Sequence, residues 1–317
     1  MAPEHATPAY LWLNGKLLRW EEATVHVSML GWSTMSAVFE GIKAYWNPDD
    51  EQLYAYQFRE HYARFARSMK LQRMEPRWSP EDLIQATLDL VRANGAREDT
   101  YISPLAYLGD STFYGTQTES STHVRIIAHP FESGLGTGRT TRACVSSWTR
   151  ISDNVLSPRV KCISNYQNSR LAAVEAKMNG YDQPILLNHQ GKVAEGGASC
   201  LFLVRDGIAI TPSVTSGILE SITRATILRL CREALGIPTE EREVDRTELY
   251  VADEVFFCGT GAEVRAVAEI DGYTVGASAV GPVTERIEHL FHRIVRGREP
   301  RYRDWLMPVY APVASPA

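Results

Sequence analysis

Lys161 is the residue whose surroundings are least usual for its type. It lies between Val160 and Cys162 in a short apolar run that predicts a strand, and a helical pattern from Asn165 to Met178 follows it. Burial of an ammonium group lowers its pKa and supplies the neutral amine that Schiff-base formation requires. The alternative is a strand lysine whose ammonium reaches solvent, which is the more common case for such a stretch taken alone.

Lysines are scarce in this chain, which contains six among its 33 basic residues. Only Lys43 and Lys161 lie in strand-like apolar runs, so lysine chemistry has two candidates. The others follow turn sequences or come late in helical patterns, where a cation suits the helix dipole: Lys16, Lys192, Lys70 and Lys177.

An acid and two hydroxyl-bearing turns follow Lys161 along the chain. Glu195 ends a predicted strand before two glycines, which allow close backbone approach, although an exposed turn acid is the commoner reading. Ser221 and Thr223 fall in the first turn of a predicted helix, and Thr260 lies in a glycine-lined turn after a buried strand. Both places suit an anion such as phosphate, and simple helix capping is the alternative for the first.

The glycine-rich stretch from Gly134 to Gly138 is not a nucleotide motif. A Walker motif needs Gly-Lys-Ser/Thr after it, and a dinucleotide fingerprint needs a following helix, whereas a strand pattern from Arg139 follows here. The stretch is therefore interpreted as a linker. The predicted organisation is a small α+β domain over residues 1–131, a connection over 132–140 and a larger domain over 141–317.

Composition limits the classes of function. The 317 residues carry 33 basic and 38 acidic side chains, a net charge of −5, which argues against binding to nucleic acid or membrane surfaces. No apolar run reaches the length of a membrane span, and no secretion signal precedes residue 8, so we expect a cytoplasmic protein. Five cysteines without Cys-x-x-Cys spacing predict reduced, mostly buried thiols and no metal site. His289 and His292, three residues apart, are expected to lie on the surface or to pack in the core rather than to bind a metal.

Local signals divide the chain into elements. Asn14-Gly15 predicts a hairpin, Ser79-Pro80 predicts a helix start, and Asn94-Gly95 predicts the end of that helix. In the second half, the run from Pro184 to Ile210 predicts antiparallel strands with a turn at Arg205-Asp206-Gly207. Helices and strands come in blocks, which favours an α+β class.

The order of these features resembles the class IV aminotransferases, the pyridoxal 5′-phosphate enzymes of fold type IV, and most closely the branched-chain amino acid aminotransferases. A strand lysine, a tyrosine at 166, an acid before Gly-Gly and two hydroxyl-bearing turns carry the resemblance. It extends over nearly the whole chain through five further stretches: Trp12-Leu-Asn-Gly, Val38-Phe-Glu-Gly-Ile, Phe58-Arg-Glu-His, Ala252-Asp-Glu-Val-Phe-Phe-Cys-Gly-Thr and Gly281-Pro-Val-Thr. It implies a two-domain, D-amino acid aminotransferase-like fold with an interdomain loop over the active site.

The resemblance also implies residue roles. Lys161 would hold the cofactor covalently and move the proton between the substrate Cα and the cofactor, and Glu195 would meet the pyridine nitrogen. Tyr166 would bind the ring's phenolic oxygen, and Leu219 would pack on the ring. The remaining implied residues hold the phosphate (Arg59, Ile222, Thr223 and Thr260), orient the substrate α-carboxylate (Tyr101, Thr260 and Gly261) or line the side-chain pocket (Phe39 and Gly41).

Four positions depart from the family pattern. Cys200 stands where the family has an asparagine five residues after the acid. Thr34, Ser103 and Gly134 stand where branched-chain enzymes use a tyrosine, an arginine and a second tyrosine to seat the side-chain carboxylate of glutamate. A desolvated carboxylate needs charged or multiple donors, so we expect altered recognition of glutamate and 2-oxoglutarate. The substitute cations that the sequence offers are Lys43 and the arginines of residues 139–142.

The expected reaction moves an amino group from a branched-chain or hydrophobic amino acid to a 2-keto acid. An (R)-selective amine or D-amino acid aminotransferase is the alternative within the fold, because the carboxylate pocket is replaced. A pyridoxal-phosphate lyase such as aminodeoxychorismate lyase, and a non-enzymatic protein on this fold, are further alternatives; retention of Lys161, Tyr166 and Glu195 argues against the last. The family resemblance also implies a homodimer.

Overall fold

In the computed structural model, residues 7–27, 30–109 and 121–310 are described. The chain forms two compact units: unit 1 comprises Met1–Ser133 and Arg293–Ala317, and unit 2 comprises Gly134–His292. The sequence placed residues 293–317 in the second domain, and the structure corrects this. Their strand pairs with a strand of unit 1, Leu306 opposite Tyr56, and a pairing over so long a separation leaves no local signal.

Unit 1 is built on one sheet, whose described strands run in the order β17-β5-β4-β6-β7-β1-β2, with β3 on β6. The hairpin between β1 and β2 turns at Asn14 and Gly15, both with positive φ, as the sequence predicted. The strands of this sheet are β1 (Tyr10–Leu13), β2 (Lys16–Arg19), β3 (Val38–Phe39), β4 (Ile42–Asn47), β5 (Gln52–Tyr56), β6 (Thr100–Leu108), β7 (Thr122–Pro130) and β17 (Leu306–Pro308).

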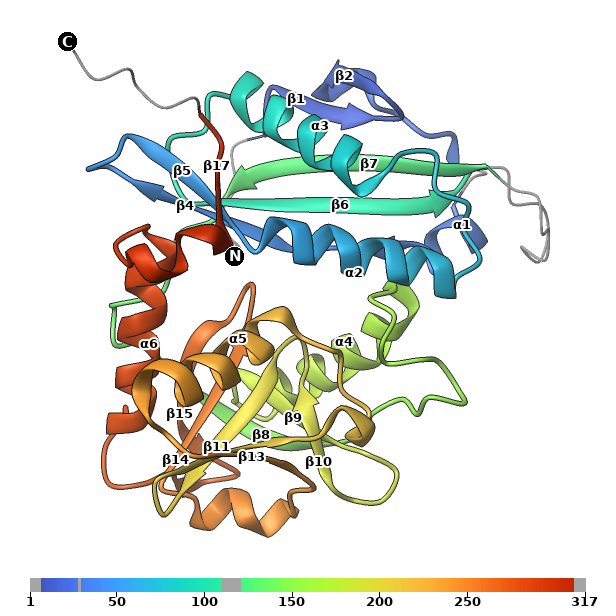
Figure 1. Cartoon of the computed structure of the whole chain (residues 1–317). Helices are drawn as coiled ribbons and strands as arrows, with labels where there is room; N and C mark the ends of the chain where they lie inside the picture. Colours follow the sequence, from blue (N-terminus) through green and yellow to red (C-terminus); the bar gives the residue numbers. More distant parts are fainter. Residues whose placement is uncertain (1–6, 28–29, 110–120, 311–317) are drawn as a thin grey trace. The chain divides into compact units, whose positions relative to one another are not determined.

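Helices α2 (Phe58–Leu71) and α3 (Pro80–Ala93) pack against each other and on this sheet (Figure 1). The predicted start of α3 is confirmed: the Ser79 hydroxyl accepts from the Asp82 N–H, and the Asp82 carboxylate accepts from the Ser79 N–H. Along β6, Ile102 and Ala106 are fully buried, whereas Tyr101 and Ser103 are half-buried on the opposite face. The short helix α1 (Trp32–Met35) precedes β3.

Glu40 fixes the break between β3 and β4. Its carboxylate is fully buried, and it accepts from Nε and Nη2 of Arg64 at 2.7 and 2.8 Å and lies 2.8 Å from Nδ1 of His61. Burial pulls the pKa of Glu40 upward, but the Arg64 charge and the hydrogen bonds from both partners outweigh it and hold the pKa well below its usual range. The cluster ties α2 to the chain between Phe39 and Gly41.

Replacing Glu40 with glutamine is expected to lower the free energy of unfolding by about 3–5 kcal/mol at pH 7, because Arg64 keeps its buried charge and loses its partner. Because the pKa of Glu40 is lower in the folded state, ionised Glu40 stabilises the fold at pH values above its unfolded pKa of about 4.3. This stabilisation is lost as pH falls below that value, so the difference in free energy of unfolding between Glu40→Gln and wild type should be smaller at pH 3 than at pH 6. Urea unfolding at several pH values measures this. Glu60→Gln, on the exposed side of α2, is the matched control; equal stability of the two variants would contradict the prediction.

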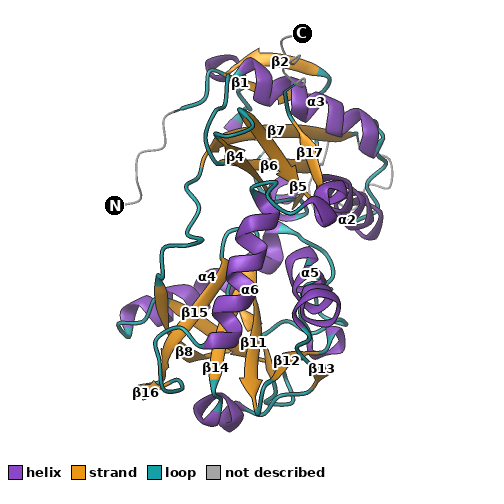
Figure 2. Cartoon of the chain, turned by 60° about the vertical axis from the view of Figure 1, so that its left-hand side comes forward, coloured by secondary structure: helices purple, strands orange, loops and turns teal. Residues whose placement is uncertain are grey.

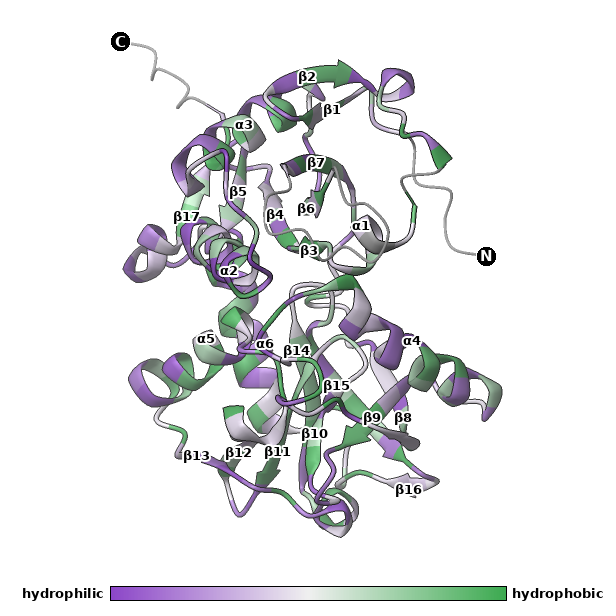
Figure 3. Ribbon diagram, turned by 90° about the vertical axis from the view of Figure 1, so that its right-hand side faces the viewer, coloured by the Kyte–Doolittle hydropathy of each residue, from purple (hydrophilic) through white to green (hydrophobic). Residues whose placement is uncertain are grey.

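Unit 2 contains a mixed sheet with the described strand order β10-β9-β8-β15-β14-β11-β12-β13, and β16 on β15. Its central strand β14 is buried throughout and hydrophobic (Figure 3). The strands are β8 (Thr140–Thr149), β9 (Gln183–Leu187), β10 (Val193–Gly196), β11 (Cys200–Arg205), β12 (Ile208–Pro212), β13 (Thr239–Arg242), β14 (Glu254–Gly259), β15 (Glu263–Ile270) and β16 (Tyr273–Thr274).

The expectation of antiparallel strands holds for the hairpins β9–β10 and β11–β12, whereas β8–β9, β8–β15 and β12–β13 are parallel. Two of the parallel pairs are joined by helical crossovers, α4 (Ile163–Met178) between β8 and β9 and α5 (Ile222–Leu230) between β12 and β13. Helix α4 packs on β8 and β9, and α5 packs on β14 (Figure 2). Helix α6 (Pro282–Val295) starts directly after Gly281.

All five cysteines are buried thiols. Within the described ranges, no helix is long and apolar enough to cross a membrane, and no group of three or more His, Cys, Asp or Glu side chains is arranged to hold a metal ion.

Candidate active site

Lys161 lies in a connection, not in the predicted strand. The chain turns between residues 158 and 160, and α4 starts at Ile163 with Cys162 as its extended N-cap. The Asn165 amide donates to the carbonyl oxygens of Ser157 and Val160 at 2.9 and 2.8 Å, which ties this connection to the first turn of α4. Val160 and Cys162 are buried, but they belong to the connection before α4 and not to a strand. The prediction of a strand from this apolar run was therefore wrong.

The Lys161 amine contacts Tyr166. Its Nζ donates to the Tyr166 hydroxyl at 2.6 Å and lies 4.8 Å from the centroid of that ring. Tyr166 is one helical turn into α4, so the helix start fixes the spacing of the two side chains. Both are half-buried, which leaves the amine accessible to a ligand.

Glu195 is a buried carboxylate held at both oxygens. Its Oε1 lies 2.8 Å from Nη2 of Arg150, and its Oε2 accepts from the Leu219 N–H at 3.1 Å. Burial raises the pKa of Glu195, while the Arg150 guanidinium, the Leu219 amide and the Lys161 ammonium oppose that rise. Lys161 therefore lies within electrostatic reach of the Glu195 carboxylate.

Sequence reasoning missed Arg150. It follows β8, is itself buried, and its Nε donates to the Gly217 carbonyl oxygen at 3.2 Å, so it bridges the end of β8 to the segment before Leu219. The chain has 27 arginines, and nothing local distinguishes this one, because its partner Glu195 is distant in sequence. Cys200 also joins this cluster, with its Sγ 3.9 Å from Glu195 Oε2 and 3.7 Å from the Leu219 carbonyl oxygen.

Replacing Arg150 with methionine is expected to lower the free energy of unfolding by about 3–5 kcal/mol at pH 7, because Glu195 is left as an uncompensated buried charge. Without the guanidinium, the pKa of Glu195 should rise further in the folded state. The folded variant then binds a proton that the unfolded chain releases above a pH of about 4.3, so its stability should fall as pH rises. Unfolding curves from pH 4 to pH 8 measure this; a deficit that is the same at every pH would contradict the assigned cause.

The start of α5 provides unpaired backbone donors. The Ser221 hydroxyl accepts from the Arg224 N–H at 3.2 Å, so Ser221 is the N-cap, as the capping alternative predicted. The amides of Ile222 and Thr223 precede the first intrahelical hydrogen bond, as in any helix. Thr223 is buried, and its hydroxyl lies in that same first turn. Capping by Ser221 therefore leaves two amides and one hydroxyl for an anion.

The turn between β14 and β15 holds Thr260 and Gly261. A Cβ at Gly261 would meet no atom within 4 Å, so the backbone here borders open space. Unit 2 therefore carries three groups that a protonated pyridine ring with an aldehyde and a phosphate ester requires. They are a lysine amine for the aldehyde, a buried carboxylate for the ring nitrogen, and the amides of a helix start for the phosphate. These residues fit pyridoxal phosphate.

The implied substrate residues of unit 1 lie on one face of β6. Tyr101 and Ser103 are two residues apart on β6 and so lie on the same face of the strand. Phe39 of β3 is paired with Leu105 of β6, which lies on that face too. A Cβ at Gly41 would overlap the Tyr101 hydroxyl, so any larger residue here would displace the Tyr101 ring. Thr34 is exposed on α1, and Arg59 is exposed in the first turn of α2.

The substitute cations named from the sequence are already engaged or exposed. Lys43 is 1% exposed, with its Nζ 4.7 Å from the Phe131 ring centroid and 3.4 Å from the Glu132 carbonyl oxygen. Arg142 forms an exposed ion pair with Glu269 at 2.8 Å, and Arg139 is exposed. In unit 2, Arg265 fills the space beside Gly134, where a Cβ would lie 2.2 Å from its Nη2.

The chain is similar to known proteins over nearly its whole length. The family described as amino-transferase class IV matches residues 37–270. A probable branched-chain-amino-acid aminotransferase of Aquifex aeolicus is 41% identical over 95% of this chain and 97% of its own. The solved branched-chain amino acid aminotransferase of Thermobaculum terrenum, in its PLP form, is 48% identical with a TM-score of 0.94, covering 96% of this chain and 99% of that one. The solved branched-chain aminotransferase of the archaeon Thermoproteus uzoniensis, with norvaline, is 41% identical with a TM-score of 0.90, covering 96% and 100%.

Proposed function

Because this chain belongs to the class IV aminotransferases and uses pyridoxal phosphate, we propose that it moves the amino group of a branched-chain amino acid to a 2-keto acid. The observation that carries the proposal is the pairing of Lys161 Nζ with the Tyr166 hydroxyl beside the buried Glu195–Arg150 pair. The names of the similar proteins support the branched-chain substrate, rather than a chiral amine, a D-amino acid or a lyase substrate.

The bound cofactor supplies an electron sink that stabilises negative charge at the substrate Cα. Lys161 would hold the cofactor covalently; once the substrate amine has displaced it, the freed Nζ would take the proton from the substrate Cα and return it. The Tyr166 hydroxyl, 2.6 Å from Nζ, orients the amine and would bind the ring oxygen. Glu195, kept in place by Arg150 and the Leu219 amide, would hold the proton on the ring nitrogen.

The remaining roles follow from position within each unit. Arg59 and the donors of the α5 start and the β14–β15 turn would bind the phosphate, namely Ile222, Thr223 and Thr260. The substrate α-carboxylate would be oriented by Tyr101, Thr260 and Gly261, and Leu219 would pack on the ring. The face that holds the half-buried Phe39 and the buried Gly41 suits an aliphatic side chain, because it offers apolar surface beside a residue without a side chain.

A donor and acceptor panel tests the proposal. We expect L-leucine, L-isoleucine and L-valine to be used with a 2-keto acid, and D-alanine and (R)-1-phenylethylamine to be used at rates lower by at least about tenfold. Chiral chromatography of the amino acid formed from 4-methyl-2-oxopentanoate should return the L-enantiomer. A D-product, or pyruvate release without an acceptor keto acid, would contradict the proposal. We also propose that the protein is a cytoplasmic homodimer. Light scattering of the purified protein measures its molar mass in solution and so tests the dimer.

A further inference from the structure

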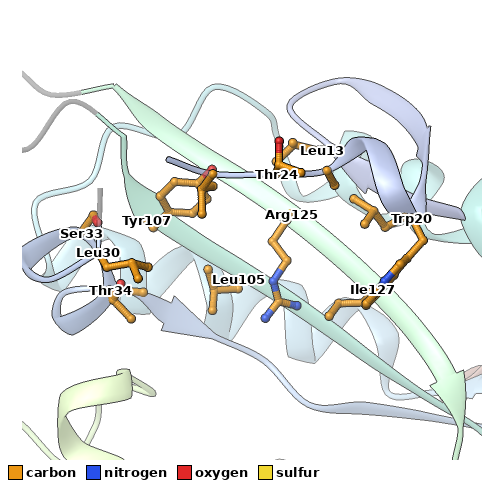
Figure 4. Close-up of a pocket in the computed structure, with 14 residues that line it drawn as sticks. Leu13, Trp20, Thr24, Leu30, Ser33, Thr34, Leu105, Tyr107, Arg125 and Ile127 are labelled. Atoms are coloured by element: carbon orange, nitrogen blue, oxygen red, sulfur yellow. The ribbon is translucent and has the colours of Figure 1, made fainter. Parts of the chain in front are cut away.

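A cavity of about 370 Å³ opens on the same face of the unit 1 sheet that carries Tyr101 and Ser103. It lies between β1, β6, β7 and the segment that leads into β3, and its walls are mainly apolar (Figure 4). The wall residues that the argument uses are Leu30, Thr34, Leu105, Tyr107, Arg125 and Ile127.

Arg125 is the one cation among the described residues that line this cavity. It stands opposite Leu105 in the β6–β7 pairing, and its side chain extends between Leu105 and Ile127 (Figure 4). Its Nη1 donates to the Ser103 carbonyl oxygen at 2.8 Å and lies 3.5 Å from the Ser103 hydroxyl. In the part of the chain that the structure describes, Arg125 forms no ion pair.

A guanidinium in an apolar wall is costly unless an anion compensates it. Desolvation lowers the pKa of Arg125 to about 10, and the nearby Tyr107 opposes this only in part. One carbonyl and one hydroxyl use part of a five-donor group, so several N–H donors remain directed at the cavity. Arginine binds carboxylates through two parallel hydrogen bonds, and water-poor apolar walls strengthen such a pair.

We propose that this cavity is the subsite for the distal carboxylate of a dicarboxylic substrate, such as glutamate or 2-oxoglutarate, and that Arg125 is the residue that binds it. The inference rests on the proposed aminotransferase function and specifies its amino-group partner. Arg125 lies beside Ser103, one of the positions where the sequence lacks the expected cation, and Thr34, another of these positions, lines the same cavity. The cation that the family pattern places at position 103 on β6 is thus replaced in this chain by Arg125 on the neighbouring strand β7.

Steady-state kinetics of Arg125→Gln tests the subsite. With L-valine as donor, kcat/KM for 2-oxoglutarate should fall about 30-fold or more, mostly through KM, since truncating one partner of a desolvated charge pair costs at least that factor. The value for 4-methyl-2-oxopentanoate, which lacks the distal carboxylate, should change by less than about threefold. Arg125→Lys should recover part of the 2-oxoglutarate activity, because it keeps the charge but loses the two-pronged geometry.

Three variants separate this site from its competitors. Arg67→Gln, an exposed arginine on α2, is the matched control and should behave as wild type. Arg142→Gln and Arg265→Gln test the other cations; a selective loss of 2-oxoglutarate use in either, with Arg125→Gln unaffected, would overturn the assignment. An equal loss for both keto acids in Arg125→Gln would also overturn it, because that pattern indicates a structural role.

A binding measurement keeps the two proposals distinguishable. Glutarate should raise the Tm of the wild-type holoenzyme and leave that of Arg125→Gln unchanged, since a ligand stabilises only the form that binds it. If no keto acid is aminated, the proposed function fails, while the glutarate shift still decides the subsite. Because Arg125 has no ion-pair partner among the described residues, the Tm of Arg125→Gln without ligand should be no lower than that of wild type; a lower one indicates a structural role and counts against the subsite.

Discussion

Replacing Lys161 with alanine is expected to lower kcat/KM for L-leucine by about 10⁴-fold or more. The variant loses both the covalent attachment of the cofactor and the base that moves the Cα proton, and proton transfer by a positioned side chain alone contributes up to about 10⁴-fold. The visible absorbance of the lysine-bound cofactor should disappear at the same time. Stopped-flow and steady-state assays measure the rate, and a spectrum measures the attachment.

Lys192→Ala is the control for Lys161→Ala. Lys192 forms an ion pair with Asp245 at 2.6 Å, outside the cluster around Glu195. The activity of the Lys192→Ala variant should therefore stay within about twofold of wild type. Substantial transamination by Lys161→Ala would refute the assigned role of Lys161 and favour Lys43 as the attachment point of the cofactor. Full loss of the absorbance band in Lys161→Ala but not in Lys43→Ala would exclude Lys43 as the attachment point.

Replacing Glu195 with glutamine is expected to reduce kcat by about 10²–10³-fold with a smaller change in KM. The substitution keeps the side-chain shape but removes the charge that would hold a proton on the ring nitrogen, and removing one such electrostatic contact costs a factor of this order. The protein should still bind the cofactor through Lys161. Wild-type kcat in Glu195→Gln would show that this carboxylate is not the ring-nitrogen partner.

Stability has to be separated from chemistry here, because Glu195→Gln also leaves Arg150 buried without its partner. The double variant Glu195→Gln with Arg150→Met removes both charges and should recover much of the stability that either single variant loses. Its kcat should remain as low as that of Glu195→Gln. Recovery of activity along with stability would indicate that the single variant failed through misfolding rather than through lost charge.

Local signals predicted much of this fold. The turns at Asn14-Gly15 and Asp206-Gly207 adopt positive φ at both positions, and Ser79 and Ser221 cap their helices. Each depends on a few adjacent residues, so the sequence carries the information directly. The parallel pairings of β8 and β12, and the return of β17 to β5, depend on contacts between distant segments and leave no comparable pattern.

The site divides in the same way. Lys161, Tyr166 and Glu195 could be named because their types and order are distinctive, although the apolar run around Lys161 suggested a strand where the chain forms a turn and a helix cap. Arg150 and Arg125 could not be named. Each is identified only by its partners, which other strands and loops contribute and which tertiary structure alone supplies.

The pairing of β17 with β5 also bears on how the protein is made. A ribosome extends the nascent chain from its N-terminus, so Gly134–His292 is complete and contiguous before Leu306 has been synthesised. Until then β5, whose five residues are all buried in the finished structure, has an open apolar edge that invites wrong pairing. Closure comes only with the last segment, when the Val309 N–H donates to the Leu53 carbonyl oxygen and the Gln52 amide donates to that of Tyr310. Unit 1 therefore cannot complete its sheet until a segment that follows all of unit 2 in the chain has been made.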